Sequence, residues 1–536
     1  MHAFCVCNMK KILSIFLMLC IVSSLSAVPA RKGWESRTLE DGSTVELQQR
    51  GDEFYHYWET RDGKVAVMQE NGTFVLTDES TPTPSQVAAR RIASPYHRRS
   101  IGTINLAPRG LVILVNYSDV SFRPENTRAA MDSMMNAQGY SYNGATGSSR
   151  DYFIAQSDSQ YMPVFDVVGP VTLTQERAYY GGNKTNKEGT DKNAAQMIVD
   201  ACQLINSEVD FSLYDNDNNG EIDFVYVIYA GLGEADGGPA ASVWPHNWQV
   251  YTGASKTCYL DGKLLNSYAC SAELSQDETT KSEIRSTIGT PSHEFGHVIG
   301  LPDYYDTKSG VNYDEWLTPN NWSIMDYGCY NNNGNTPPNY SIFDKYYIGW
   351  ATPQHLAANA QLDVTLGTGY YEGYQLTGGA NLLPYSTTNT VYYIENRQMQ
   401  GWDAALPGHG MLVWQVKYSS SDWYYNRPNN QDNNPRYTLL SAVENAVIGG
   451  TASSNNPFPG SANVTQCTPL TGCAMTEITE TNSVISFKYN GGAPSDHTDV
   501  EYKPYPANGV RKTLRDGQLI IVRGEEQYNA QGIKIQ

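Results

Sequence analysis

The sequence predicts three structural units: a central α+β domain, a short β-rich unit before it and an all-β domain after it. Within residues 101–350, apolar strand-like runs alternate with a segment of helical spacing. Residues 28–100 hold short strand-like runs separated by turn dipeptides, and residues 351–490 hold strand-like runs between long Asn-, Ser- and Gly-rich loops. A chain of 536 residues is long enough for two or three domains.

The first 27 residues have the pattern of a signal peptide. Met9-Lys10-Lys11 is a basic start, residues 12–22 are apolar, and small residues lead to a cleavage site at Ser26-Ala27. The apolar run is too short to span a membrane comfortably. We therefore expect a secreted or cell-surface protein with no stable membrane insertion.

Residues 28–100 are predicted to be a propeptide and linker. Runs at 44–48, 54–58 and 73–76 indicate a short β-meander, because turn dipeptides separate them. Residues 82–100 are rich in Pro, Ser and Arg and include the dibasic pairs Arg90-Arg91 and Arg98-Arg99. A permanent accessory domain is the alternative interpretation.

The central unit, residues 101–350, contains the elements of an α+β domain. Leu111 to Tyr117 and Phe224 to Ala230 are apolar runs typical of buried strands. Residues 193–205 have helical spacing, with one apolar face. That face consists of Ala194, Met197, Ile198, Ala201 and Ile205.

One segment of this unit, residues 293–303, reads H-E-F-G-H-V-I-G-L-P-D. On a helix beginning near Thr290-Pro291, His293 and His297 lie on one face and can bind one metal ion. Glu294 then lies beside the open coordination position, where a general base is needed. The alternative is two surface histidines with an ordinary glutamate.

The end of the same segment supplies a third ligand. Gly300 can adopt a left-handed conformation that ends the helix and turns the chain back. Asp303 then reaches the ion, with Asp306 as the alternative ligand. Three protein ligands and an open fourth position are typical of catalytic rather than structural zinc.

Residues 322–328, W-S-I-M-D-Y-G, resemble the Met-turn of the metzincins, in which a methionine lies beneath the metal. Met325 is that methionine. The resemblance implies that Tyr327 stabilises the oxyanion, and the alternative is that Tyr327 only packs beside the turn.

The chain resembles the immune inhibitor A family of secreted bacterial metallopeptidases over most of residues 105–420. The resemblance implies a metzincin-type catalytic domain and a zinc endopeptidase, with Glu294 as the base. We expect His246 and His409 to be structural. The stretches that carry it include G-L-V-I-L-V at 110–115, D-Y-F at 151–153, W-P-H at 244–246, E-N-R-Q at 395–398 and L-P-G-H-G at 406–410.

Residues 215–223, D-N-D-N-N-G-E-I-D, resemble the first part of an EF-hand loop, with oxygen ligands at alternate positions and glycine at the sixth. The twelfth position is Tyr226 rather than glutamate, so the motif is incomplete. A turn that needs no ion is the alternative. The predicted calcium ligands are Asp215, Asp217, Asn219, the Glu221 carbonyl and Asp223.

Charge and cysteine content constrain partners and compartment. A net charge of −19 argues against nucleic-acid binding, because phosphates would repel the chain. Three of the nine cysteines lie in the leader, which leaves six for disulfides in an exported protein. Of the fifteen connectivities that six cysteines allow, we expect Cys258–Cys270, Cys467–Cys473 and Cys202–Cys329.

Residues 351–490 are predicted to form a β-sandwich, with strands at 362–366, 391–395, 411–416 and 484–489. Residues 491–536 form a linker and a tail with a hairpin over 516–522 and 527–529. The tail resembles the C-terminal sorting regions of type IX secretion cargo, and the alternative is a last pair of strands of the preceding domain.

These observations predict a monomeric zinc endopeptidase that acts on protein or peptide substrates. A catalytically silent surface-binding protein that works through its β-sandwich is the alternative. We also expect latency, with the 28–100 segment removed at Arg91 or Arg99. Residues 28–100 contain no cysteine, so a group that blocks the metal must be an oxygen or nitrogen donor. The candidates are Asp41, Asp52, Asp62, Asp78 and His56.

Overall fold

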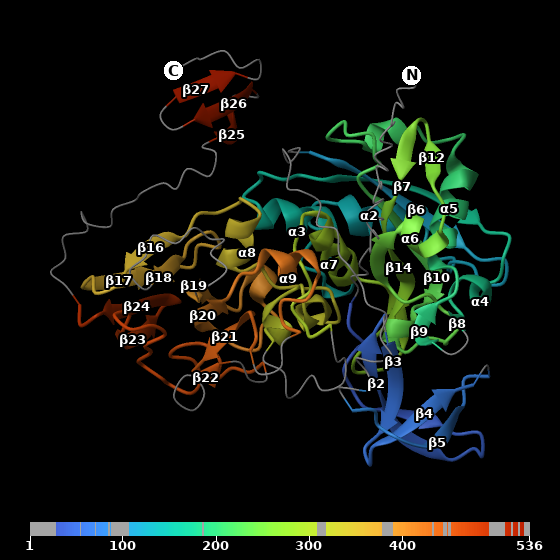
Figure 1. Cartoon of the computed structure of the whole chain (residues 1–536), viewed down its shortest axis with the longest axis horizontal. Helices are drawn as coiled ribbons and strands as arrows, with labels where there is room; N and C mark the ends of the chain where they lie inside the picture. Colours follow the sequence, from blue (N-terminus) through green and yellow to red (C-terminus); the bar gives the residue numbers. More distant parts are fainter. Residues whose placement is uncertain are drawn as a thin grey trace, which may run out of the picture.

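The computed structural model describes residues 28–53, 55–69, 71–83, 86, 107–184, 187–307, 318–377, 390–430, 434–442, 447–448 and 452–492, and three strands within 510–529. Over these residues the chain is a mixed α/β protein (Figure 1). The predicted signal peptide, the dibasic pairs and the predicted Arg91 and Arg99 cleavage sites lie outside the described residues. No helix of the described part is long and apolar enough to cross a membrane.

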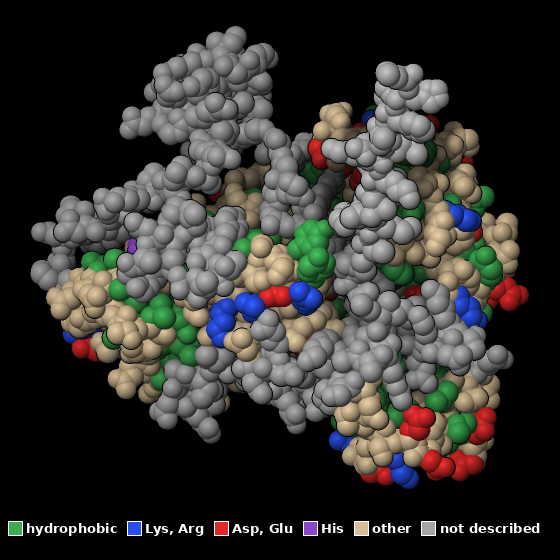
Figure 2. Space-filling model, in the orientation of Figure 1, with side chains coloured by type: hydrophobic (Ala, Val, Ile, Leu, Met, Phe, Trp, Pro, Cys, Tyr) green, Lys and Arg blue, Asp and Glu red, His purple; other side chains and the backbone are tan. Residues whose placement is uncertain are grey.

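The N-terminal unit is one antiparallel sheet in the order β1-β2-β3-β4-β5, which confirms the predicted short strands. Its own small core consists of Leu47, Trp58, Ala66 and Phe74. Figure 2 shows acidic and basic side chains on the outer surface of this unit, at the lower right. The strands are β1 Glu35–Thr38, β2 Thr44–Asp52, β3 Tyr55–Thr60, β4 Lys64–Met68 and β5 Phe74–Ser80.

The central unit is built on a sheet in the order β11-β14-β10-β6-β7, with β15 pairing β14. Strands β14, β10, β6 and β7 run parallel to one another, whereas β11 and β15 run antiparallel to β14. The predicted strands at 111–117 and 224–230 are confirmed as β6 and β10. The strands are β6 Arg109–Asn116, β7 Val164–Thr172, β10 Val225–Leu232, β11 His246–Gln249, β14 Ser267–Gln276 and β15 Glu283–Arg285.

Alternate residues of the central strands face two different cores, as the period of a strand requires. On β6, Leu111 and Ile113 join one core and Val112 and Leu114 join the other. The first core lies under the predicted helix, confirmed as α5 Ala194–Ile205. The second lies under α2, α3 and α7 (Figure 1). The helices of this unit are α2 Arg128–Asn136, α3 Ser149–Gln156, α4 Arg177–Tyr180, α6 Val250–Ala254, α7 Gly289–Val298 and α8 Ile342–Tyr347.

Short elements complete the central unit. They are the two-stranded sheets β8 Asn183–Lys184 with β9 Lys187–Asp191 and β12 Cys258–Leu260 with β13 Lys263–Leu265, and the 3₁₀ turns η1 Tyr142–Gly144, η2 Phe211–Tyr214, η3 Glu234–Asp236, η4 Asn320–Trp322 and η5 Tyr327–Tyr330.

The C-terminal region contains a sheet in the order β16-β18-β19-β20-β21-β22 and a smaller sheet in the order β17-β24-β23. The four predicted strands are confirmed as β17, β19, β20 and β24. The elements are β16 Gln354–Ala357, β17 Leu362–Leu366, β18 Tyr374–Thr377, β19 Val391–Arg397, η6 Gly401–Asp403, β20 Gly410–Val416, α9 Ser420–Tyr424, β21 Tyr437–Ser441, β22 Val447–Ile448, β23 Met475–Thr481 and β24 Val484–Tyr489.

The larger C-terminal sheet is covered on both faces. Tyr392 and Ile394 of β19 pack in the core shared with the smaller sheet. Val391 and Tyr393, which point the other way, join the core that contains Phe295 of α7. The central and C-terminal regions therefore share one hydrophobic core.

The predicted tail hairpin is confirmed. Strands β25 Val510–Arg515, β26 Gln518–Arg523 and β27 Glu526–Asn529 form an antiparallel sheet.

The disulfide prediction is wrong for the described part of the chain, where all six cysteines are buried free thiols. Cys467 pairs with Met475 across a β-bridge rather than with Cys473. Cys270 lies on β14 with its Sγ 3.6 Å from His246 Nδ1, whereas Cys258 lies on β12. Burial raises the pKa of the Cys467 thiol to about 12, so this thiol is protonated at neutral pH.

Candidate metal centre and active site

Helix α7 places His293, Glu294 and His297 inside the protein, where all three are buried. The helix begins at Gly289, one residue before the start that the sequence predicts near Thr290-Pro291. The reason is local packing: the Gly289 N–H donates to the Gly334 carbonyl, and a Cβ at Gly289 would overlap the Cys329 carbonyl oxygen.

The turn after α7 forms as predicted. Gly300 has φ of +100°, a left-handed value that favours glycine. The Leu301 N–H donates to the Gly296 carbonyl at 3.1 Å, and the Gly300 N–H donates to the His297 carbonyl at 2.9 Å. These bonds close the helix end and send the chain back toward the histidines.

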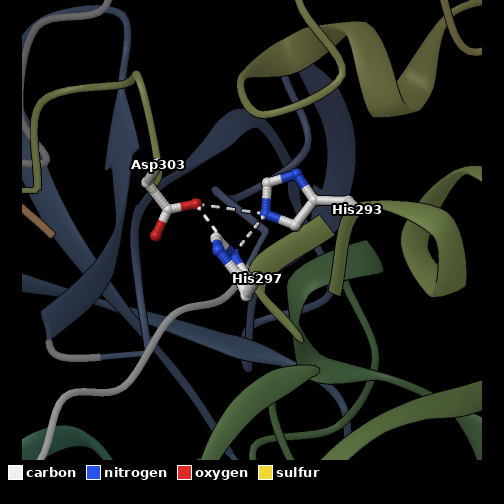
Figure 3. Close-up of side chains that lie close together, drawn as sticks. All are labelled: His293, His297 and Asp303. Atoms are coloured by element: carbon white, nitrogen blue, oxygen red, sulfur yellow. Dashed lines mark hydrogen bonds and ion pairs between the residues drawn. The ribbon is translucent and has the colours of Figure 1, made fainter. Parts of the chain in front are cut away.

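Three candidate ligand atoms converge at one point (Figure 3). Asp303 Oδ1 lies 3.1 Å from His293 Nε2 and 3.3 Å from His297 Nε2, and the two Nε2 atoms are 3.2 Å apart. Ligands of a tetrahedral zinc ion lie roughly 3.3–3.5 Å apart, given metal–ligand distances of about 2.0–2.1 Å. The two nitrogens and one carboxylate oxygen therefore fit zinc. Asp306, the alternative ligand, is not in this group.

The backbone orients both imidazoles. His293 Nδ1 lies 2.6 Å from the Ile324 carbonyl and His297 Nδ1 lies 2.8 Å from the Leu301 carbonyl. An Nδ1–H that donates to a carbonyl leaves the Nε2 lone pair free for a metal. Met325 follows Ile324, and its Sδ lies so close to the backbone of α7 that a Cβ at Gly296 would overlap it. The methionine thus lies directly against the ligand helix.

Asn426, from the C-terminal region, holds the third ligand. Its Nδ2 donates to Asp303 Oδ2 at 2.5 Å, and its Oδ1 accepts from the Asp303 N–H at 2.6 Å. Asn429 Nδ2 donates to the Tyr304 carbonyl at 2.7 Å, and Asn430 Oδ1 accepts from the Thr307 N–H at 3.0 Å. Sequence reasoning missed these residues because nothing in an Asn-rich loop more than a hundred positions away points to the site.

The two carboxylates of the site have opposite pKa shifts. Burial raises the pKa of Glu294 well above its usual value, and the charge of Asp303 raises it further, whereas the nearby Val28 backbone N–H lowers it. Burial alone would raise the pKa of Asp303, but His297 and His293 lower it to about 2. Asp303 is therefore ionised as a ligand should be.

Residues 28–32 of the N-terminal unit lie against the site. The Val28 carbonyl accepts from Trp244 Nε1 at 3.0 Å, and the Pro29 carbonyl accepts from the Tyr330 hydroxyl at 2.8 Å. Val28 and Ala30 are buried in the core that contains Phe295. A short backbone segment, with Val28 next to Glu294, therefore fills this part of the site.

None of the five predicted blocking side chains joins the ligand group. His56 Nε2 instead contacts Glu234 Oε1 at 2.8 Å, and its ring stacks on Trp244. Asp41 and Asp62 accept hydrogen bonds within their own turns, from Ser43 and Thr60. Asp52 is buried beside β3, and Asp78 is exposed. In the described structure these five side chains therefore do not join the candidate metal ligands.

Tyr327 begins η5 directly after the Met-turn and is buried. The Lys32 ammonium lies 4.0 Å from the centre of its ring. This contact places Tyr327 beside the 28–32 segment. That Tyr327 stabilises an oxyanion stays a prediction.

In the predicted calcium loop, carboxylate oxygens of Asp215, Asp217 and Asp223 lie within 4.8 Å of one another. Asn219 Oδ1 instead accepts from the Glu221 N–H at 2.8 Å. Lys263 Nζ lies 2.6 Å from Asp215 Oδ2, so an ammonium already neutralises one of the carboxylates.

Neither of the other two singled-out histidines belongs to the metal group. His246 is buried on β11, and burial lowers its pKa to about 4. His409 is exposed and pairs with Glu480 at 2.8 Å.

Two helical histidines, a returning carboxylate and a buried glutamate beside them define the metallopeptidase class of site. Residues 109–351 match the family model described as immune inhibitor A peptidase M6, catalytic domain. Residues 109–351 thus match the catalytic domain of immune inhibitor A peptidases, and the resemblance seen in the motifs is confirmed over this region.

Curated relatives match part of the chain. Pre-pro-metalloprotease PrtV of Vibrio cholerae is 26% identical over 254 residues, which cover 41% of this chain and 26% of the relative. Immune inhibitor A of Bacillus thuringiensis subsp. alesti is 28% identical over 220 residues, which cover 37% of this chain and 31% of the relative. The match therefore spans only about a quarter to a third of each relative's length.

Proposed function

We propose that this chain is a secreted zinc-dependent endopeptidase that hydrolyses peptide bonds of extracellular proteins. The convergence of His293 Nε2, His297 Nε2 and Asp303 Oδ1 within 3.1–3.3 Å carries this proposal. The family match of residues 109–351 and the metalloprotease named among the relatives support it. The metzincin-type fold and the C-terminal β-sandwich belong to the same proposal.

His293, His297 and Asp303 would hold the zinc ion. When bound, zinc acidifies a water molecule and polarises a substrate carbonyl. Glu294 takes the proton of the attacking water on its carboxylate and delivers it to the nitrogen of the leaving amine. Burial of Glu294 supports this role, because it raises the carboxylate's affinity for a proton.

A catalytically silent binding protein is the second candidate function. It needs no base beside the ion, so the buried Glu294 next to the ligands favours the peptidase. A casein or gelatin zymogram of the wild-type chain, with and without a chelator, separates the two candidates. Clearing that disappears with chelator and is restored by zinc supports the peptidase. Equal clearing with chelator, or none in the processed wild-type protein, contradicts it.

We also propose that the uncleaved chain is inactive, and the position of residues 28–32 supports this. This segment lies against Trp244, Tyr330 and Glu294, where substrate would have to bind. Removal of residues 28–100 at Arg91 or Arg99 should therefore release activity. The name of one relative, a pre-pro-metalloprotease, denotes a precursor with such segments. Equal specific activity of the uncleaved and cleaved forms would refute latency.

Calcium binding at residues 215–223 and sorting through the 491–536 tail remain proposals of the same kind. The grouped carboxylates of Asp215, Asp217 and Asp223 support the first. The three-stranded sheet β25–β27 is compatible with the second, and a secretion assay with and without residues 491–536 tests it.

A further inference from the structure

The 28–32 segment has a direction in the site that its contacts define. The Val28 backbone N–H approaches the Glu294 carboxylate, the group that would deliver a proton to the leaving nitrogen of a substrate. We therefore align the Val28 nitrogen with that leaving nitrogen, and residues 28, 29, 30 and 31 with the first four substrate residues after the cleaved bond.

The fourth of these residues, Arg31, enters a polar pocket. Its Nη1 donates to Asp236 Oδ1 at 3.2 Å, to Ser275 Oγ at 3.3 Å and to the Gln276 carbonyl. Its Nη2 donates to Asn333 Oδ1 at 3.1 Å. The guanidinium also lies 5.4 Å from the centre of the Tyr330 ring.

This pocket is built almost entirely by the central unit. Asp236 belongs to η3, Ser275 and Gln276 end β14, and Asn333 and Tyr330 follow the Met-turn. Arg31 is only 7% exposed and Asp236 only 8%, so the ion pair is withdrawn from water. The backbone is fixed there too, because the Arg31 N–H donates to the Ala235 carbonyl at 3.1 Å.

The first and third residues of the segment have apolar surroundings instead. Val28 and Ala30 are buried among apolar side chains of the main core. Only the fourth position is surrounded by a carboxylate, a carbonyl, a hydroxyl and an amide oxygen. These are acceptors, and an arginine presents donors alone.

Removal of the N-terminal unit would leave Asp236 without its cation. Burial raises the pKa of Asp236, and the Arg31 guanidinium opposes that rise. A mostly buried carboxylate that loses its counter-charge is costly, so the vacated pocket favours another cation. Glu278, whose Oε1 lies 3.5 Å from Arg31 Nη2 and whose side chain is half exposed, adds negative charge at the rim.

We propose that Asp236, Ser275, the Gln276 carbonyl and Asn333 form a substrate subsite for arginine or lysine at the fourth residue after the cleaved bond. The proposal rests on the proposed peptidase function and deepens it. It predicts that the processed enzyme prefers peptides with a basic residue at this one position.

The test uses full-length protein that has been processed to its active form, and quenched peptides that differ at a single residue. Cleavage sites are located by mass spectrometry, and kcat/KM is compared for Arg, Lys, Gln and Leu at the fourth and, separately, the fifth position. We expect about a tenfold preference for Arg over Gln at the fourth position, as a buried charge-assisted contact provides. No such preference is expected at the fifth position.

Asp236→Asn should bring the Arg-to-Gln ratio of kcat/KM at the fourth position close to one. Glu278→Gln removes the same charge at the exposed rim and should change the ratio less than about twofold. The wild-type ratio is itself decisive if Asp236→Asn does not fold. Glu294-dependent cleavage with an equal rate for Arg and Gln peptides would overturn the subsite alone. Absence of Glu294-dependent cleavage would overturn the peptidase function and the subsite with it.

Discussion

Glu294 and Asp303 are two buried carboxylates in one site, yet their surroundings favour opposite protonation states. Two imidazoles face Asp303 and hold its pKa at about 2, whereas burial and the charge of Asp303 raise the pKa of Glu294. Separated pKa values of this kind assign different roles to the two acids. Asp303 suits a ligand, and Glu294 suits a proton carrier.

Glu294→Ala should abolish peptidase activity while leaving the metal in place. The loss should be at least about 10²–10⁴-fold in kcat, the usual contribution of a general base. Turnover on a peptide substrate, with zinc content measured by mass spectrometry, tests this. An active variant would remove Glu294 from the mechanism, and a metal-free variant would make it a ligand instead.

Asp303→Ala should lower zinc occupancy, whereas Asp306→Ala should not, because only Asp303 lies with the two histidines. Equilibrium dialysis of both purified variants against buffered zinc measures the difference. A larger loss in Asp306→Ala would reverse the assignment.

Asn426→Leu should weaken zinc binding about 10–100-fold, the usual effect of removing a group that orients a metal ligand. The leucine cannot bond to the Asp303 carboxylate or its N–H, so the ligand loses its fixed orientation. Competition with a chromophoric zinc chelator gives the affinity. Asn434→Leu is the matched control, because the Asn434 side-chain oxygen accepts from Lys417 Nζ rather than from a group of Asp303. Equal affinity in the two variants would show that Asp303 needs no such support.

Helix α7 and the loop at 215–223 differ in how completely a local motif forms a site. The helix spacing and the Gly300 turn are sufficient to bring the three zinc ligands together. In the acidic loop the carboxylates of Asp215, Asp217 and Asp223 lie together, and Lys263 from β13 competes with a cation there. A neighbouring strand thus modifies a motif that looks self-contained.

If the 215–223 loop binds calcium, calcium should raise the melting temperature, and Lys263→Met should enlarge that rise. Binding to the native state alone stabilises it, and the variant removes the ammonium 2.6 Å from Asp215 Oδ2. Melting curves in calcium and in a calcium-selective chelator, with zinc saturating, measure the effect. Lys256→Met is the control, because Lys256 contacts the amide of Gln196. Curves that calcium does not move in either variant would favour a turn without an ion.

Across the whole molecule, the three predicted units meet at the site rather than standing apart. The C-terminal region contributes Asn426, and the N-terminal unit contributes residues 28–32. Buried Arg397 pairs with Asp403 and Glu395 and donates to the Asn339 carbonyl, which joins the central and C-terminal regions. Truncation between these regions would remove part of one core.

The His56–Glu234 pair makes docking of the N-terminal unit depend on pH. Burial lowers the pKa of His56, but Glu234 outweighs this, and the net pKa is raised above the ordinary 6.5. A raised histidine pKa adds stability that is complete below the unfolded value and is lost as pH rises through the folded value. The contribution should therefore decline above about pH 6.5.

The comparison uses the full chain with Glu294→Ala, which prevents self-cleavage. At pH 6 its melting temperature should exceed that of the variant that carries both Glu294→Ala and His56→Gln. This difference should shrink toward pH 9. His409→Gln serves as control, since His409 is exposed and lies far along the chain from the docking contact. A difference that stays constant from pH 6 to 9 would show that the protonation of His56 does not matter.

The sequence by itself indicated the candidate metal ligands, the proposed base and the strands of each unit, because these depend on helix spacing, a left-handed glycine and alternation of apolar residues. It predicted disulfides where the described structure has free thiols, since a spacing of cysteines does not define which strands carry them. Only the tertiary structure decided the contacts of Asn426 with Asp303, of Val28 with Glu294 and of Arg31 with Asp236. These residues lie more than a hundred positions apart, and packing of whole units brings them together.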